Sequence, residues 1–290
     1  MFDGLFNKLT EWIKEGLIDG ILSSFTGMFD SINEQVGEIA GQVGSDPESW
    51  NSGIYTLIRT LSETVVIPVA GMILTFVMCY ELISLIIDRN NMHDVDTWLF
   101  FKWIFKTYAV IFILTHTFDI VMGVFGLAQS VVNDSAGIIS GSLDIGGGAD
   151  IDALRTQLEA MGVWELLGLY LETAIVSLCT SAMSICVFIV VYGRMIEIYM
   201  VISLAPVPLS TMANKEWGQM GNNYLKSLFA LAFQGFLIMV CVAIYSVMVQ
   251  GIVDADNIHA AIWLCAGYTV LLCYTLFRTG SLSKSIFGSH

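Results

Sequence analysis

The hydrophobic positions of the chain form one amphipathic pattern followed by several long apolar runs. Over residues 1–46, large apolar side chains recur every three or four residues, which is the spacing of one face of an α-helix. Acidic residues such as Asp19 and Asp30 interrupt this stretch, so it cannot cross a bilayer. We predict an amphipathic helix that lies on a membrane or on a partner protein and ends near Gly44 and Pro47.

Five apolar runs follow, each long enough to cross the roughly 30 Å of a bilayer's hydrocarbon core as a helix. They cover residues 54–87, about 99–128, 166–192, 227–250 and about 260–277. Pro68 predicts a kink in the first run. The third run continues into an apolar segment, 195–212, which we expect to be re-entrant or tilted on the cytoplasmic side, with a sixth full span as the alternative. The chain is therefore predicted to be an all-α, polytopic transmembrane bundle.

The composition agrees with a membrane protein and excludes an ordinary soluble one. Of the 290 residues, 56% are hydrophobic and 13% are charged, and the mean hydropathy is +0.73. Side chains this apolar cannot cover a water-facing surface, so lipid must be the solvent for much of the chain. The six cysteines all fall inside apolar runs without a C-x-x-C pair, and we interpret them as small hydrophobic residues. The start of the chain lacks the pattern of a signal peptide, so we expect the first span to act as its own insertion signal.

The charged residues between the runs predict the orientation, because bases in short loops mark the cytoplasmic side. Bases gather in residues 88–106, in 193–226 and in the C-terminal tail. Three other segments carry net charges of −7, −5 and −2, and so account for the chain's whole net charge of −14: residues 1–54, 130–165 and 251–259. We therefore predict that the N-terminus lies outside the cytoplasm and the C-terminus inside it.

This pattern divides the chain into four parts. They are an extracytoplasmic amphipathic helix with its linker (1–53), the first two transmembrane helices (54–129), an acidic, glycine-rich extracytoplasmic loop (130–165) and a C-terminal transmembrane bundle (166–290) with a proline-broken elbow at 193–226.

The elbow holds the most informative polar residues of the chain. The prolines of A-P-V-P at 205–208 remove two backbone donors and must end or break a helix. Arg194 and Glu197 are three residues apart on one helix face, where an ion pair would lower the cost of charge near lipid. We interpret the elbow either as a simple turn of the chain at the cytoplasmic surface or as a gate or docking site for a partner. Its candidate residues are Arg194, Glu197, Pro206, Pro208, Trp217 and Lys226.

Other ionisable residues lie within or near the predicted spans. His116 and Asp119 share a face of the second span, Glu172 lies early in the third, and Glu81 lies near the inner end of the first. Ionisable groups inside a membrane face protein or a water path, so these residues are candidates for intramembrane polar contacts. A proton relay between His116 and Asp119 would suit a transporter, whereas hydrogen bonding between helices or a position near the membrane surface is the alternative.

The elbow also carries a resemblance to a known family. Its S-L-A-P-V-P, followed by Trp-Gly and by N-Y-L-K-S at the start of a long apolar helix, resembles the TrbL/VirB-six family over roughly residues 185–245. These proteins are polytopic inner-membrane subunits of type IV secretion and conjugation machines. The resemblance implies a channel or scaffold subunit that helps DNA, usually single-stranded, or protein leave a donor cell. It also implies other secretion subunits and separate cytoplasmic ATPases as partners.

The resemblance implies no catalytic residues, and the sequence agrees with this. The chain has no G-x-x-x-x-G-K-[ST] phosphate loop, no H-E-x-x-H and no G-x-S-x-G, so we expect neither enzymatic activity nor a cofactor. The acidic outer segments would repel DNA and lack the basic face that suits an anionic membrane, which favours protein partners and a homo-oligomer. A secondary transporter of a small solute and a purely structural anchor of the secretion complex are the alternatives.

Overall fold

The structure, a computed structural model, describes residues 2–87, 97–140, 151–251 and 258–289, and over these residues it contains helices and no strand. Five helical stretches in this part of the chain are long and apolar enough to cross a membrane. They are Ser52–Ile87, Thr97–Thr115, Val163–Ala213, Gly218–Gln250 and Ile258–Ile286. The predicted all-α, polytopic fold is therefore confirmed.

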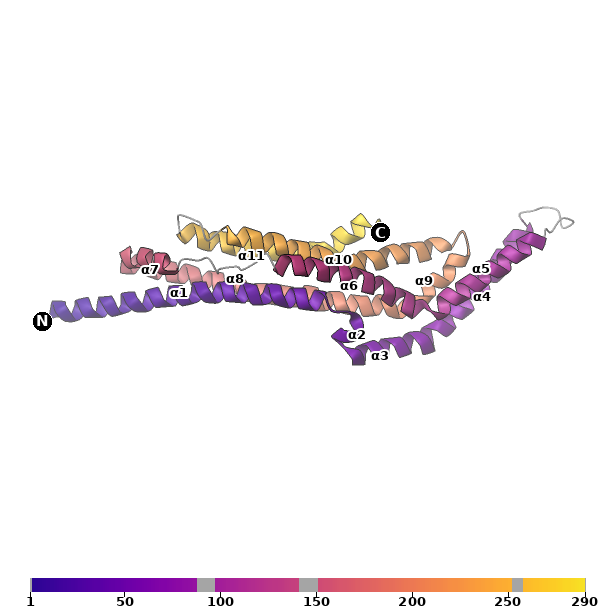
Figure 1. Ribbon diagram of the computed structural model, residues 1–290, viewed down its shortest axis with the longest axis horizontal. Coiled ribbons are helices and arrows are strands. Elements are labelled where there is room, and N and C mark those ends of the chain that lie inside the picture. Colours follow the sequence, from indigo (N-terminus) through magenta and orange to yellow (C-terminus); the bar gives the residue numbers. More distant parts are fainter. Residues whose placement is uncertain (1, 88–96, 141–150, 252–257, 290) are drawn as a thin grey trace. The chain divides into compact units, whose positions relative to one another are not determined.

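The helices follow one another as Figure 1 shows. Their bounds are α1 Phe2–Val43, α2 Pro47–Trp50, α3 Ser52–Leu61, α4 Ile67–Ile87, α5 Thr97–Thr115, α6 Thr117–Ser140, α7 Ile151–Ala160, α8 Val163–Leu204, α9 Pro206–Ser210, α10 Gly218–Gln250 and α11 Ile258–Ile286. A π-helical turn, η1 (Ser62–Val66), joins α3 to α4, and a 3₁₀ turn, η2 (Thr211–Ala213), follows α9.

The chain forms two compact units, and the long helices α6, α8, α10 and α11 contribute to both. Unit 1 consists of Met1–Val43, Asn133–Val191 and Ile238–Arg278, and unit 2 of Gly44–Val132, Tyr192–Leu237 and Thr279–His290.

In unit 1, α1 packs lengthwise along the first half of α8 (Figure 1). The side-chain amide of Gln35 donates a hydrogen bond to Ser184 Oγ over 2.8 Å, and Gly20 lies so close to Tyr170 that a Cβ there would be 2.9 Å from the ring. In both pairs the residue of α8 comes about 150 positions after its partner in α1. Because this offset is nearly constant along the two helices, they run in parallel. The apolar face of α1, with buried residues such as Ile21, is thus covered largely by the chain itself.

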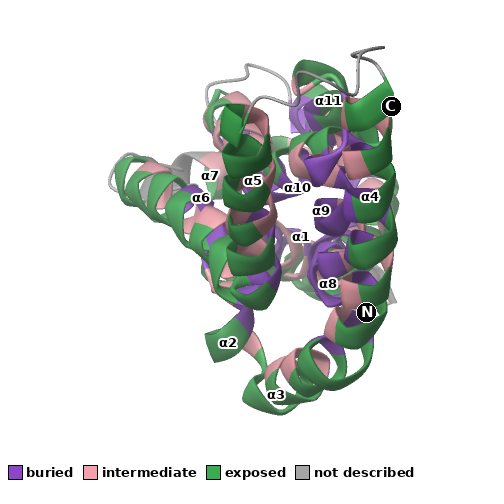
Figure 2. Cartoon of the chain, turned by 90° about the vertical axis from the view of Figure 1, so that its right-hand side faces the viewer, coloured by how far each residue is buried: buried purple, intermediate pink, exposed green. Residues whose placement is uncertain are grey.

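Unit 2 has an apolar core where α6, α8 and α10 meet. It includes Phe118 and Phe125 of α6, Ile198 of α8 and Leu228 of α10, all buried. Figure 2 colours each helix by burial, with buried residues in purple and exposed ones in green. A second cluster joins α4 to α5 and to the elbow, through Ala70, Leu74, Val77, Met78, Val110, Leu114 and Ala213.

The distortion predicted at Pro68 takes the form of the π-helical turn η1, directly before it. The backbone N–H of Ile67 donates to the carbonyl of Ser62, five residues back. In a regular α-helix the ring of Pro68 would collide with the carbonyl of Thr64, four residues earlier. The wider turn relieves this collision without interrupting the helix.

Two predicted boundaries differ in the structure. The expected span 99–128 consists of α5 and α6, which meet at His116, where Thr115 and Thr117 both donate to carbonyls one turn back and compete with the helical hydrogen bonds. The third run, predicted at about 166–192 with an apolar continuation at 195–212, forms one helix as far as Leu204, the last residue of α8. A glycine at 193 lowers helix stability by only about 1 kcal/mol, which the packing of α8 offsets.

We expect Gly221→Ala to destabilise the start of α10. An added Cβ would lie 2.8 Å from the Pro208 carbonyl and would collide with the Met212 side chain. Such overpacking lowers the free energy of unfolding by about 1–3 kcal/mol, which should appear as a lower midpoint of thermal unfolding in mild detergent. Gly218→Ala is the matched control, because its Cβ would make ordinary contacts at 3.5 Å or more. Equal midpoints for the two variants would contradict the prediction.

Candidate functional site at the elbow

Of the predicted elbow at 193–226, residues 205–217 connect α8 to α10, and from here on the word elbow means this connection. Its prolines interrupt the helix as predicted. Pro206 is the first residue of α9, where a missing N–H costs no hydrogen bond, and it is buried. The carbonyl of Pro208 accepts a hydrogen bond from the Thr211 hydroxyl over 2.7 Å. The prolines therefore end α8 and start a short, tightly turned segment.

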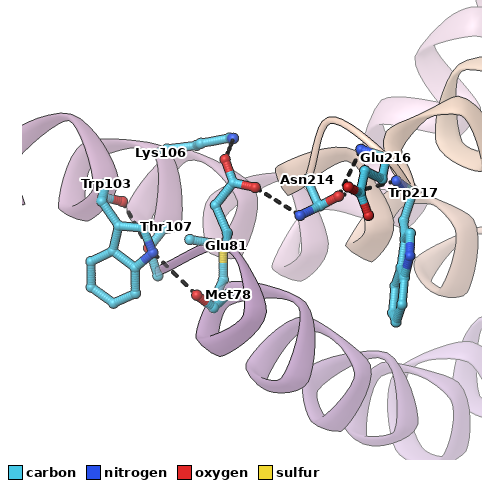
Figure 3. A network of polar contacts seen from close by, with 8 residues as sticks. All are labelled: Met78, Glu81, Trp103, Lys106, Thr107, Asn214, Glu216 and Trp217. Atoms are coloured by element: carbon cyan, nitrogen blue, oxygen red, sulfur yellow. Dashed lines mark hydrogen bonds and ion pairs between the residues drawn. The ribbon is translucent and has the colours of Figure 1, made fainter. Parts of the chain in front are cut away.

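Both polar atoms of the Asn214 side-chain amide make hydrogen bonds that hold the end of the elbow in place (Figure 3). Its Oδ1 accepts hydrogen bonds from the backbone N–H groups of Glu216 and Trp217, over 2.7 and 3.1 Å. Its Nδ2 donates to Glu81 Oε2 over 2.7 Å. Because Asn214 is only 4% exposed, each of these bonds replaces one that water would otherwise make.

Glu81 of α4 lies between Asn214 and a lysine of α5. Lys106 Nζ donates to Glu81 Oε1 over 2.7 Å, so both carboxylate oxygens have a partner (Figure 3). Glu81 is 8% exposed, and a carboxylate this buried is tolerated only when it is paired and hydrogen-bonded. The trio Glu81, Lys106 and Asn214 therefore joins α4, α5 and the elbow through one charge.

Stacked aromatic rings join the same elements next to this trio. The ring of Trp217 stacks against Phe76 and Tyr80 of α4, with centroid distances of 5.5 and 5.9 Å. The Tyr80 hydroxyl also donates to Glu216 Oε2 over 3.1 Å. Each aromatic pair contributes about 0.5–1.5 kcal/mol beyond its buried area. The elbow is thus fastened to α4 by polar and aromatic contacts together.

Of the predicted elbow residues, the structure places Trp217 in this cluster and Pro206 and Pro208 in α9, earlier in the same segment. Lys226 lies on α10 and is exposed.

The expectation of an ion pair between Arg194 and Glu197 is wrong, because each residue has a different partner. Arg194 is buried and donates from its guanidinium to the carbonyl of Ala232 on α10, over 3.3 Å. Glu197 pairs with Lys284 in the last turn of α11, at 3.1 Å. Residues three apart differ in direction by only about 60° around the helix axis, so Arg194 and Glu197 lie on the same side of α8. Arg194 is nevertheless buried against α10, while Glu197, at the edge of that side, remains partly exposed.

The intramembrane candidates contact other helices or nearby backbone rather than one another. Asp119 lies 3.7 Å from the Arg59 guanidinium, whereas His116 Nδ1 lies 3.0 Å from the carbonyl of Phe112, four residues earlier in the chain. The structure therefore does not bring His116 and Asp119 together as a relay. Glu172 lies 2.8 Å from Nδ1 of His259 on α11, which makes it a contact between helices of unit 1.

Sequence reasoning missed Asn214, Lys106, Arg59 and His259 as partners in these contacts. A signal for Asn214 exists, because Asn shortly before a helix often accepts bonds from the backbone beyond it. The lone charges in apolar runs also indicate that partners must exist, but not which residues they are. Over the residues that the structure describes, no group of three His, Cys, Asp or Glu residues could hold a metal ion.

A family model described as TrbL/VirB6 plasmid conjugal transfer like protein matches residues 32–206, from the second half of α1 to the first residue of α9. No curated protein matches the chain, and no solved structure does. The match ends at Pro206, so Asn214 and Trp217 lie beyond it.

We expect Lys106→Met to destabilise the elbow more than Lys102→Met does. The first change leaves Glu81, a buried carboxylate, with Asn214 alone, and such a loss lowers the free energy of unfolding by about 1–3 kcal/mol. Lys102 is exposed and lies over the Trp98 ring, so its loss should cost less than about 1 kcal/mol. Thermal unfolding in mild detergent measures both, and the double variant Glu81→Gln/Lys106→Met should recover part of the loss. A similar effect of the two single variants would show that the trio does not hold the elbow.

Proposed function

Because the chain belongs to the family of TrbL/VirB6 plasmid conjugal transfer like proteins, we propose that it is a channel or scaffold subunit of a type IV secretion apparatus for conjugation. In this role it helps to move DNA, single-stranded and protein-bound, across the donor's inner membrane. The family match over residues 32–206, more than half of the chain, carries the proposal. The five helices that could cross a membrane support it, because such a subunit must reside in the bilayer.

The proposed partners are further copies of the chain, other membrane subunits of the apparatus and its cytoplasmic ATPases. Large apolar side chains on α5 support this assembly. Only 11% of the apolar stretch of α5 is buried, against 50% for α10, and Phe101, Phe105 and Tyr108 are exposed. Aromatic residues are enriched where proteins meet, so we propose that this helix contacts another subunit. The ATPases supply the energy, and the chain itself performs no catalysis.

In this proposal the elbow acts as a rigid joint rather than as a loose loop. The trio of Glu81, Lys106 and Asn214 and the stacked Trp217 tie the break after α8 to α4 and α5. A force on the helix pair α4 and α5 is thereby transmitted to the start of α10. Such a joint suits a subunit that changes shape when a cytoplasmic motor binds.

An in-frame deletion of the gene in a donor strain tests the proposed function. We expect mating frequency to fall by at least a hundredfold and a complementing copy to restore it. Normal transfer from the deletion strain would refute the proposal. Crosslinking of the chain to DNA during transfer then separates the two roles, because a channel subunit is expected to crosslink and a pure anchor is not.

The double variant Pro206→Ala/Pro208→Ala tests the elbow in the same assay. Alanine restores two backbone donors and favours continuation of α8, which should displace Asn214 from Glu81. We expect mating frequency to fall at least tenfold while the amount of protein in the membrane stays normal. Pro47→Ala, the same change at the first residue of α2, is the control and should transfer normally. Unchanged transfer by the double variant would exclude a role for the elbow's geometry.

A further inference from the structure

The three apolar helices of unit 1 lie side by side over the same part of their length. The 21 residues of α8 between Glu172 and Arg194 include no charged residue, and the two end residues are about 33 Å apart at about 1.5 Å per residue. This matches the roughly 30 Å of a hydrocarbon core. On α11 the uncharged stretch begins at His259, which contacts Glu172 itself. Tyr245 of α10 contacts Thr269 of α11 over 3.1 Å, so α10 lies in the same layer.

The second half of α1 lies in this layer too. Gly20 faces Tyr170, and Gln35 contacts Ser184, so residues 23–41 of α1 run beside about residues 173–191 of α8. A contact with a different helix gives the same alignment. The Cys265 thiol of α11 lies 3.5 Å from the sulfur of Met28 on α1. Cys265 comes six residues after His259, which contacts Glu172, and Met28 lies beside a residue of α8 about six positions after Glu172.

The outer face of α1 at this level is acidic. Asp30, Glu34 and Glu38 are exposed on it, whereas Ile32 and Ile39 on the opposite face are buried. Gly27 and Gly37 share the acidic face, and a Cβ added at either would meet nothing within 4 Å. The face is therefore open along its length.

The other helices of unit 1 expose apolar side chains in the same layer. On α8, Leu178 is 72% exposed and Ile185 is 63% exposed, and Val247 of α10 and Val270 of α11 are also exposed. These surfaces suit lipid. Carboxylates facing lipid are costly and rare, and charged residues at membrane depth face protein or a water-filled cavity. The acidic face of α1 thus requires water or protein as its surroundings, whereas the exposed faces of α8, α10 and α11 suit lipid.

We propose that residues 23–41 of α1 lie within the thickness of the bilayer and that the face bearing Asp30, Glu34 and Glu38 borders a water-filled space. The stretch cannot cross a membrane alone, but the packing of its apolar face against α8 removes the need for lipid on that side. This differs from the expectation that the stretch cannot cross a membrane and that residues 1–53 lie outside the cytoplasm, because a helix beside residues 173–191 of α8 extends through the same layer. It rests on the proposed function in one respect, because the acidic face would form a wall of the conduit that repels the phosphates of passing DNA.

Cysteine labelling in opened donor-cell membranes tests this placement. Single cysteines are introduced into a chain whose six native cysteines are replaced by serine. The acidic-face variants are Gly27→Cys and Glu34→Cys, and the matched controls at the same level of α8 are Leu178→Cys and Ile185→Cys. A charged, water-soluble methanethiosulfonate reacts with the thiolate, which forms in water and not in lipid. We expect the acidic-face variants to react at least tenfold faster than the controls.

Either of two other results would overturn the placement. Fast reaction at all four positions would show that this layer of unit 1 lies outside the bilayer. Slow reaction at all four would show that protein or lipid covers the acidic face. The labelling rates do not depend on DNA transfer, so a normal mating frequency in the deletion strain would refute the proposed function and leave this result intact.

A second measurement keeps the native cysteines. Glu34→Lys places a different charge on the acidic face, and Ile185→Lys places the same charge on the lipid-facing surface at the same level. We expect Glu34→Lys to accumulate in the membrane as the unaltered chain does and Ile185→Lys to accumulate several-fold less. Equal accumulation of the two variants would contradict a water-facing α1.

Discussion

The carboxylate of Glu81 is the interaction on which the elbow depends. A charge in an apolar helix is tolerated only when its partners are in place, and here they come from α5 and from the segment after α9. Lys106 and Asn214 must therefore remain close to α4 for the charge to be satisfied. The stacking of Trp217 on α4 keeps the backbone near Asn214 in the same position. One buried charge thus holds the segment between α8, which the prolines end, and α10 against α4 and α5.

The same constraint explains the other lone charges in the apolar runs. Asp119 pairs with Arg59, Glu172 contacts His259, and Glu197 pairs with Lys284. In each case the partner lies on a different helix, so the contact also sets which helices are neighbours. Charges that are costly in lipid thereby add specificity to packing that apolar side chains alone would leave loosely determined.

Two features of the chain bear on its proposed role in conjugation, and they lie in different units. In unit 2, the elbow after the prolines is held against α4 and α5, two helices with much exposed apolar surface. The acidic face of α1 in unit 1 lies beside apolar helices. A subunit of a secretion apparatus needs both surfaces that bind neighbouring subunits and surfaces that water can wet. The chain keeps them on separate helices.

The sequence by itself determined the fold class, the approximate position of the spans, the break at Pro206 and the family. These follow from local properties, namely the length of apolar runs, the missing N–H of proline and short motifs. Only the tertiary structure decided that α8 continues through Arg194, that Glu197 pairs with Lys284 and that α1 packs in parallel with α8. The partners in these contacts lie 87 and 149 residues apart, and no local pattern encodes which distant residue a charge or an amide will meet.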